Sequence, residues 1–163
     1  PTTVRAMSHE ARLTAAGIVL PRPYPSAGLY EKAVLVGDLL YVGGHGPVTD
    51  DPAERINGKV GPDGAVPLEQ ARLAARLTGL QILTSVRLTL GTLDRVERVV
   101  KVFGMVNCAP GFNQTPAVID GCSELFHEVF GDAGRHTRSA VGMAELPFDI
   151  PVEIEAIFQV TAG

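Results

Sequence analysis

Runs of apolar residues along the chain predict five β-strands. The first two are separated by Gly37 and Asp38, and this two-residue link favours a tight hairpin because glycine supplies the positive φ of the turn. The third run is almost continuously apolar, which is typical of a central strand covered on both faces. The predicted strands are residues 33–36, 39–42, 96–106, 137–143 and 152–160.

Two long helices are predicted from apolar residues that recur at helical spacing. The first spans residues 68–90 with a wide apolar stripe, which implies burial along much of its length, and Gly91 is placed to end it. The second begins at Thr115, which can cap the helix ahead of Pro116, and runs to about Phe130. On the first helix, the positions expected to face solvent are Arg72, Arg76, Gln81 and Ser85.

Residues 1–26 are expected to form a helical arm packed on a single domain that comprises residues 1–163. Ser8 can cap a short helix that runs to Ala16, and Gly17 can end it in the left-handed conformation. Regular structure is then excluded by three prolines, Pro21, Pro23 and Pro25.

The order of elements predicts an α+β fold, because two strands, a helix, a strand, a helix and two strands follow one another. Both helices would lie on one face of the sheet. The other face is expected to be apolar and to need a partner, and subunit association is the economical way to cover it.

The composition limits the classes of function. Apolar residues make up 45% and charged residues 20% of the chain, and the net charge of -4 argues against nucleic-acid binding through a broad basic face. No apolar run approaches the roughly 20 residues that span a bilayer. Cys108 and Cys122 are expected to be reduced in a cytoplasmic protein, and the four scattered histidines predict no metal site.

The first candidate for chemistry is the segment 135–155. Arg138 and Glu153 stand in strand-like surroundings, where an ionised group is costly to bury without a partner or a ligand. One interpretation is therefore a ligand site. The alternative is that Arg138 forms a structural ion pair and that Glu153 and Glu155 face solvent.

The second candidate is the sequence G-G-H-G-P at residues 43–47, which follows the second strand. Glycines let a backbone approach a ligand closely, and this would place His45 at the rim of a cleft. The alternative is a strand end with a bulge. The glycine spacing is not that of a phosphate-binding loop.

Residues 27–160 resemble the YjgF/YER057c/UK114 family, also called RidA-like or endoribonuclease L-PSP-like proteins. The most specific match runs from Arg138 and Ser139 through Leu146-Pro147 to the sequence E-I-E-A at residues 153–156. The longer form R-H-T-R-S-A-V-G is similar to a divergent subgroup. The resemblance implies a chorismate-mutase-like mixed sheet with two helices packed on one face, and a homotrimer with three clefts between subunits.

The best-known members of that family hydrolyse reactive 2-imino acids, or their enamine tautomers, to 2-keto acids and ammonia, with no metal or organic cofactor. By resemblance, Arg138 would grip the substrate carboxylate through its bidentate fork, and Glu153 would position the attacking water. Gly44 and Tyr30 would line the same cleft. Asp120 stands where the family has an asparagine.

Three positions depart from the well-studied branch of the family. Gly43 replaces a serine, His45 replaces a glutamine and Ala140 replaces a cysteine. Because an imidazole titrates near neutral pH, His45 could act as the base in place of Glu153.

Several functions are consistent with these residues. The first is hydrolysis of a small imine or enamine that carries a carboxylate. The second is a non-catalytic trimer that binds small carboxylates between subunits. The third is the ribonuclease activity that the family name implies, which the acidic charge disfavours because RNA binding depends on phosphate neutralisation. Chorismate mutase activity would follow from fold analogy alone.

Overall fold

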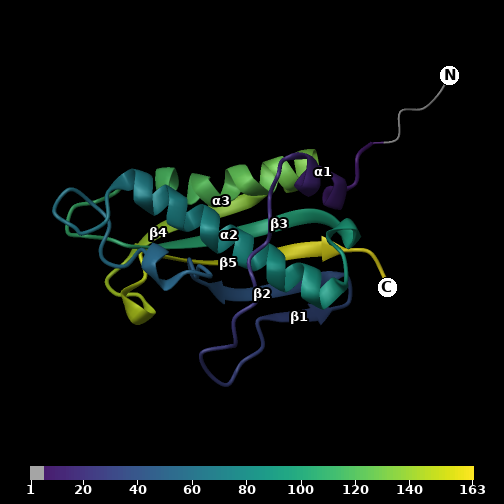
Figure 1. Cartoon of the computed structure of the whole chain (residues 1–163), viewed down its shortest axis with the longest axis horizontal. Coiled ribbons are helices and arrows are strands. Elements are labelled where there is room, and N and C mark those ends of the chain that lie inside the picture. The colour runs from purple at the N-terminus through teal and green to yellow at the C-terminus, as the bar shows by residue number, and fades with distance from the viewer. Residues whose placement is uncertain (1–5) are drawn as a thin grey trace.

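The computed structural model describes residues 6–163, which form one five-stranded sheet with three α-helices (Figure 1). The elements are α1 (His9–Ala15), β1 (Ala33–Val36), β2 (Leu39–His45), α2 (Leu68–Leu90), β3 (Val96–Asn107), α3 (Thr115–Phe130), β4 (Thr137–Met143) and β5 (Val152–Val160). The strands are hydrogen-bonded in the order β1-β2-β5-β3-β4. The sheet is mixed because β3 and β4 are parallel, whereas the other neighbours are antiparallel. The predicted α+β class is confirmed.

The boundaries of the elements agree closely with the periodicity of the sequence. The predicted hairpin turn is present, with Gly37 at a φ of 61°. Helix α2 occupies the predicted residues and ends at Gly91 in the left-handed conformation. Helix α3 differs at its start, because Thr115 is its first residue and not its cap. The Thr115 hydroxyl instead donates to the carbonyl of Ala140 in β4, at 2.9 Å, and so ties the helix to the edge of the sheet.

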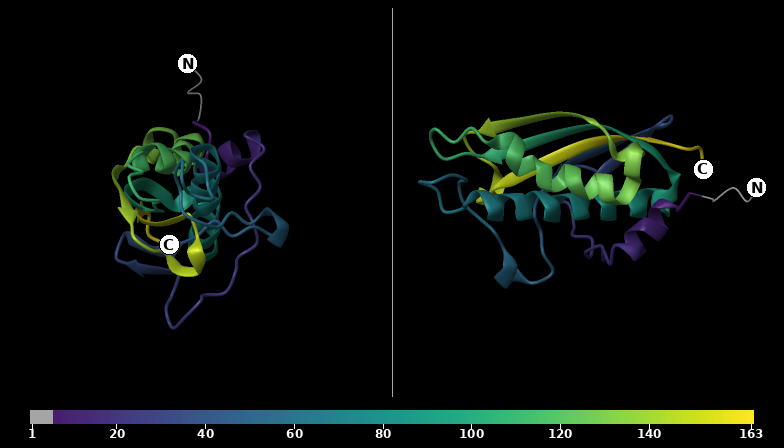
Figure 2. Two further views of the ribbon diagram at one scale, coloured as in Figure 1. Left: turned by 90° about the vertical axis from the view of Figure 1, so that its left-hand side faces the viewer. Right: turned by 90° about the horizontal axis from the view of Figure 1, so that it is seen from above.

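Helices α2 and α3 lie side by side on one face of the sheet (Figure 2). Side chains alternate between the two faces along each strand. In β5, the positions that face the helices are buried: Val152, Ile154, Ala156, Phe158 and Val160. The alternate positions, which include Glu153 and Glu155, belong to the open face.

The open face carries exposed apolar and charged side chains together. Its exposed apolar side chains are Val34, Val36, Tyr41 and Val141. Lys101 and Glu155 lie on the same face, in register with Ile157 and Phe103. The expected apolar face is therefore present only in part.

Two polar residues of α2 that were expected to face solvent are buried instead. The amide of Gln81 donates to the carbonyl of Val48 at 2.9 Å, and the hydroxyl of Ser85 bonds to the ring of His45 at 2.7 Å. Both side chains therefore form hydrogen bonds with residues at or just after the end of β2, where buried polar groups need partners inside the protein. The expectation that Gln81 and Ser85 face solvent was wrong.

The described part of the N-terminal arm packs along the domain. Helix α1 is capped by Ser8, buries Leu13, and contacts α3. The chain then crosses α2 (Figure 1), where the hydroxyl of Thr84 donates to the carbonyl of Pro21 at 3.0 Å. The arm thus runs from one end of the helical layer to the region beside β2.

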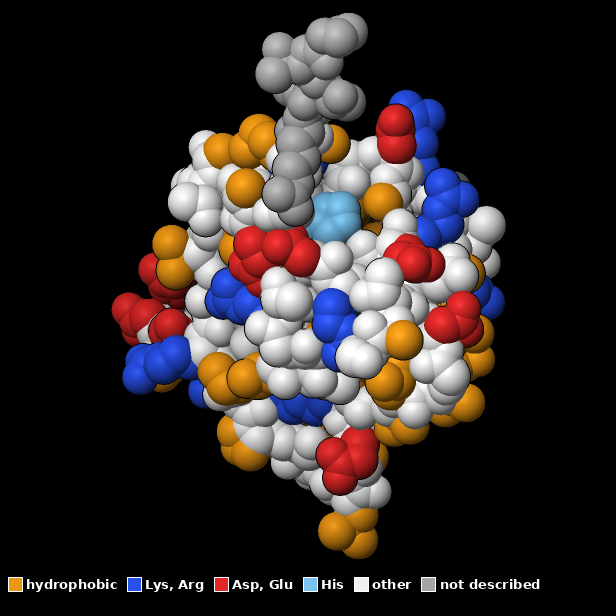
Figure 3. Space-filling model, turned by 90° about the vertical axis from the view of Figure 1, so that its right-hand side faces the viewer, with side chains coloured by type: hydrophobic (Ala, Val, Ile, Leu, Met, Phe, Trp, Pro, Cys, Tyr) orange, Lys and Arg blue, Asp and Glu red, His pale blue; other side chains and the backbone are white. Residues whose placement is uncertain are grey.

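Acidic and basic side chains are interspersed on the end of the molecule shown in Figure 3. No helix among residues 6–163 is both long and apolar enough to cross a membrane.

Helices α2 and α3 approach each other closely at Gly121. A Cβ atom at this position would overlap the carbonyl oxygen of Arg72 in α2. Two ion pairs flank the contact and join Arg72 to Glu124 at 2.7 Å and Arg76 to Glu128 at 3.1 Å. The absence of a side chain at Gly121 therefore sets the distance between the helices.

Gly121→Ala should lower the free energy of unfolding by about 1–3 kcal/mol, because the added methyl group overlaps backbone that cannot move aside. Alanine normally favours a helix over glycine, so this sign would run against helix propensity. Chemical denaturation at one protein concentration measures the change. Gly79→Ala is the matched control. A Cβ atom at Gly79 would stand 2.9 Å from the side chain of Leu125 and 3.0 Å from that of Cys122, and side-chain atoms can shift where backbone cannot. An equal or smaller loss in Gly121→Ala would contradict the prediction.

Candidate functional site

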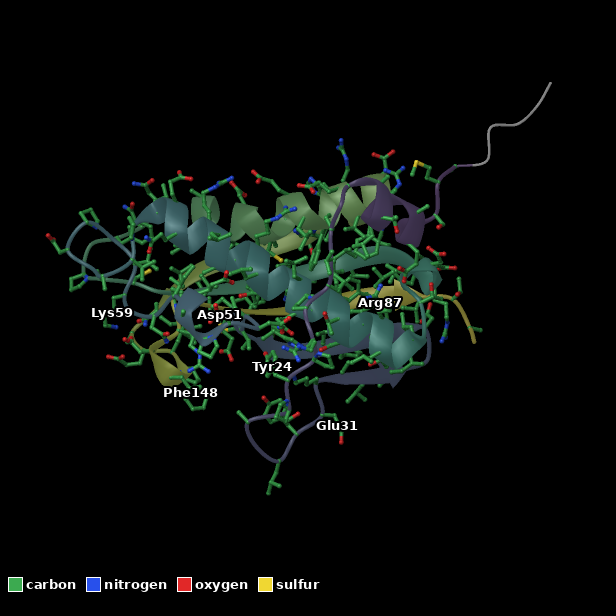
Figure 4. All side chains as sticks on the ribbon, in the orientation of Figure 1. Tyr24, Glu31, Asp51, Lys59, Arg87 and Phe148 are labelled. Atoms are coloured by element: carbon green, nitrogen blue, oxygen red, sulfur yellow. The ribbon has the colours of Figure 1, made fainter. Side chains whose placement is uncertain are left out.

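A cavity of about 510 Å³ lies where the end of β2 and the start of β5 meet two irregular segments. One segment is the N-terminal arm with the loop that follows it, and the other is the 3-10 turn η4 (Pro147–Asp149). In Figure 4, Tyr24 and Phe148 belong to these two segments. The sheet contributes Gly44 and Glu153 to the lining, and the loop after the arm contributes Tyr30.

Glu153 lies directly against the backbone of Gly44. A Cβ atom on Gly44 would stand only 2.6 Å from the Oε1 atom of Glu153. Burial raises the pKa of the Glu153 carboxyl above its usual value, and the negative charge of Glu155 raises that pKa further. None of the residues 6–163 donates a hydrogen bond to this carboxylate. Such a group is suited to accepting a proton from a molecule in the cavity.

Tyr24 brings a hydroxyl group to the same cavity. The Gly46 N–H points to this hydroxyl at 3.5 Å, and burial raises the pKa of the phenol. Lys32 fixes the tyrosine, because its ammonium lies 3.2 Å from the ring centroid and also donates to the Tyr24 carbonyl. Tyr24 was not among the predicted site residues. It lies in the proline-rich arm, just before residues 27–160, over which the sequence analysis found its resemblance.

Arg138 and Asp120 form a separate cluster. The Nη1 atom of Arg138 donates to Oδ1 of Asp120 at 2.7 Å and to the Ser123 hydroxyl at 3.1 Å. The Arg138 side chain is 22% exposed. The structure thus contains an ion pair of the kind that the structural alternative for Arg138 requires.

A histidine that the sequence reasoning passed over completes this cluster. The Ser123 hydroxyl donates to Nε2 of His136 at 2.9 Å, while Nδ1–H of the same ring donates to the Gly134 carbonyl at 2.6 Å. Burial lowers the pKa of His136, the bond to Gly134 opposes this, and the charges of His127 and Arg138 lower the pKa further. Strand alternation could not place His136, because it lies just before the first residue of β4.

The two clusters lie on opposite faces of the sheet within one chain. Arg138 pairs with Val102, which pairs with Ala156, and both of these neighbours are buried beneath the helices. Cross-strand neighbours point to the same side, so Arg138 belongs to the helical face. Glu153 is three residues before Ala156 in β5. Side chains alternate along a strand, so Glu153 belongs to the open face. The structure therefore brings Glu153, Gly44 and Tyr30 together, and Arg138 and Asp120 together, but does not join the two sets.

Most of the chain matches a single protein family. The profile of the family described as "YjgF/chorismate mutase-like, putative endoribonuclease" matches residues 10–152. The chain belongs to the YjgF family. The resemblance inferred from Arg138-Ser139, Leu146-Pro147 and the E-I-E-A sequence is confirmed.

Three proteins illustrate the range of the similarity. Protein TCP17 of Trypanosoma cruzi is 38% identical over 150 residues, which cover 91% of this chain and 92% of that protein. A 2-iminobutanoate/2-iminopropanoate deaminase of Dermatophagoides farinae is 28% identical over 130 residues, with 80% and 84% covered. The crystal structure of Atu1372 from Agrobacterium tumefaciens, a protein of unknown function, is 38% identical with a TM-score of 0.83, and the match covers 95% of this chain and 93% of that one.

His45 has a structural place in this YjgF-family chain, away from the rim at which the sequence reasoning put it. The side chain is buried, Nδ1–H donates to the Gly43 carbonyl at 2.7 Å, and Nε2 accepts from Ser85 at 2.7 Å. Burial lowers the pKa of His45, the bond to Gly43 opposes this, and the charge of Lys32 lowers the pKa further. Both ring nitrogens are engaged, so no proton-accepting atom of His45 faces the cavity.

A bulge, which was the alternative interpretation of residues 43–47, explains this orientation. Val42 pairs with Ala156 and His45 pairs with Ile154, so three steps along β2 correspond to two steps along β5. The extra residue turns His45 toward α2 and leaves Gly44 facing the cavity. Among residues 6–163, no group of three or more histidine, cysteine, aspartate or glutamate side chains could hold a metal ion.

His45→Asn should lower the free energy of unfolding at pH 7.5 by about 1–3 kcal/mol, because it leaves the Ser85 hydroxyl buried without its partner. The folded-state pKa of His45 is lowered, so the stability from the neutral ring is fully present above the unfolded value of about 6.5 and is lost as pH falls. The difference between wild type and variant should therefore shrink at pH 5.5. Urea denaturation at both pH values tests this, and a constant difference would contradict it.

Proposed function

We propose that this chain hydrolyses a small reactive imine or enamine bearing a carboxylate to a keto acid and ammonia, at a cleft between subunits of a homotrimer. The observation that carries the proposal is the half-buried Glu153 carboxylate, which lies against Gly44 in a cavity of about 510 Å³ with no donor among residues 6–163. The similarity to the deaminase of Dermatophagoides farinae supports the same reaction class.

In the proposed reaction, Glu153 accepts a proton from a water molecule as the water oxygen attacks the C=N carbon. Glu153 passes that proton to the imine nitrogen, and a tetrahedral carbinolamine forms. Glu153 then takes the proton of the carbinolamine hydroxyl and passes it to the nitrogen, so that the C–N bond breaks, ammonia leaves and the oxygen forms the C=O bond of the keto acid. One water is consumed for each imine. Because an imine is already electrophilic, positioning of water and substrate supplies much of the rate.

The separation of Arg138 from Glu153 supports assembly from several copies. A cleft that contains both side chains has to take them from two chains, because they lie on opposite faces of one sheet. Strand β4, which carries Arg138, is an edge strand and is open to a neighbour. Asp120 and Ser123 bond only to Nη1 of Arg138, so Nε and Nη2 have no hydrogen-bond partner in the described chain and can receive a carboxylate.

Glu153→Gln should lower kcat by about 10²-fold or more, the usual contribution of a general base, because an amide cannot accept the proton. Turnover is measured on imines generated in the assay in the presence of semicarbazide. Hydrolysis of an imine lowers the amount of semicarbazone that forms from it. Glu155→Gln is the matched control, because it removes a carboxylate from the same strand and face but not from the cavity, and its kcat should stay within about threefold of wild type. Normal turnover in Glu153→Gln would remove Glu153 from the mechanism.

Arg138→Lys should weaken the binding of pyruvate by about tenfold or more, since an ammonium cannot replace the planar fork of a guanidinium. Calorimetry measures the affinity, and light scattering on the same sample checks for a trimer. Arg76→Lys, at an arginine that pairs with Glu128, is the control and should bind as wild type does. Unchanged affinity in Arg138→Lys would leave Arg138 with the structural ion pair alone, and a monomeric wild type would contradict the intersubunit cleft.

A further inference from the structure

The lining of the cavity combines polar and apolar groups. Its polar groups are the Glu153 carboxylate and the Tyr24 hydroxyl, to which the Gly46 N–H points. Its apolar side chains are Val48, Pro147, Phe148 and Ile150. Ligand sites of this kind orient the reacting group through a few polar groups and hold the remainder of the molecule against the apolar surface.

The turn that carries Phe148 is held in a costly conformation. Phe148 and Asp149 have φ values of 57° and 55°, in the left-handed region that residues with a side chain rarely adopt. Hydrogen bonds hold the turn in place: the Asn57 amide donates to the Phe148 carbonyl at 2.9 Å, and the amide of the buried Asn107 donates to the Asp149 carboxylate at 3.0 Å. Strain maintained in this way beside a cavity points to a functional use of the residue that it presents.

Phe148 is 79% exposed, which is unusual for a phenylalanine fixed so firmly. Tyr24, which Lys32 holds in place, lines the same cavity. Three aromatic side chains from outside the sheet, Tyr24, Tyr30 and Phe148, therefore line the same cavity as Glu153. Tyr24 and Phe148 are labelled in Figure 4.

We propose that the cavity takes a substrate whose side chain is aromatic or large and apolar, with Phe148 as the residue that contacts this side chain and determines the preference. This inference rests on the proposed function for the identity of the head group. The volume of about 510 Å³ lies within the range of about 300–1,000 Å³ that small-molecule sites occupy. Each buried methylene improves affinity by about fourfold.

Binding of three keto acids with the same head group tests the preference without requiring turnover. Calorimetry on the wild-type protein should show phenylpyruvate binding at least about tenfold more tightly than pyruvate. 2-Ketoglutarate, which is larger than pyruvate but carries a second carboxylate, should gain nothing over pyruvate. Phe148→Ala should reduce the preference for phenylpyruvate by about tenfold and leave pyruvate affinity unchanged. The control is Leu73→Ala, at an exposed leucine of α2, which should bind as wild type does.

Equal affinities for phenylpyruvate and pyruvate in the wild type would overturn the inference. So would a Phe148→Ala variant that loses both ligands equally or changes its mass in light scattering, because Phe148 would then serve the fold or a subunit contact. The proposed function and this inference can fail separately. A preference for phenylpyruvate without hydrolysis of any imine would support the inferred side-chain class and contradict the proposed reaction. Hydrolysis of an alanine-derived imine without a preference for phenylpyruvate would support the reaction and contradict the side-chain class.

Discussion

The contact between Glu153 and Gly44 constrains the whole end of β2. Because the Glu153 carboxylate occupies the space of a Cβ atom on residue 44, any larger residue there would displace the carboxylate, and the strand presents this glycine toward the cavity. The extra residue in β2 achieves this, and it turns His45 into the interior. The buried imidazole then needs a hydrogen-bond partner, which Ser85 of α2 provides. One close contact on the open face of the sheet is thus linked to a polar residue in a helix on the other face.

The sheet also keeps two opposite charges of the candidate site apart. The carboxylate of Glu153 and the guanidinium of Arg138 are carried by strands two places apart in one sheet, yet they point to opposite sides. Within one chain they cannot neutralise each other. Arg138 has Asp120 as its counter-ion, whereas Glu153 has none among residues 6–163 and keeps a raised pKa. A group poised in this way is stabilised by whatever proton donor or cation enters the cavity.

The sequence predicted the parts of the structure that depend on local periodicity. The helix over residues 68–90 and the hairpin around Gly37 follow from spacing and turn chemistry, and both are present. The predictions failed where a partner distant in sequence decides the outcome. Ser85 is buried because of a residue 40 positions earlier, and the orientation of His45 depends on one extra residue that reverses the alternation of side chains.

The resemblance implied one cleft for all the candidate site residues. In one chain, Glu153, Gly44 and Tyr30 line one cavity, whereas Arg138 pairs with Asp120 on the other face of the sheet, and the roles of these residues stay predictions. Tyr24 was missed because prolines in the arm leave no periodic pattern from which its position could be inferred.

The walls of the cavity differ in how freely they can vary. Glu153 and Gly44 belong to strands whose backbone hydrogen bonds and buried alternate residues also hold the core together. Tyr24 and Phe148 lie in segments outside the sheet, in the arm and in η4. Substitutions at Tyr24 or Phe148 leave the strand pairing and the core intact. Descendants of one gene could therefore diverge in the molecules they accept while they inherit the same scaffold and the same carboxylate.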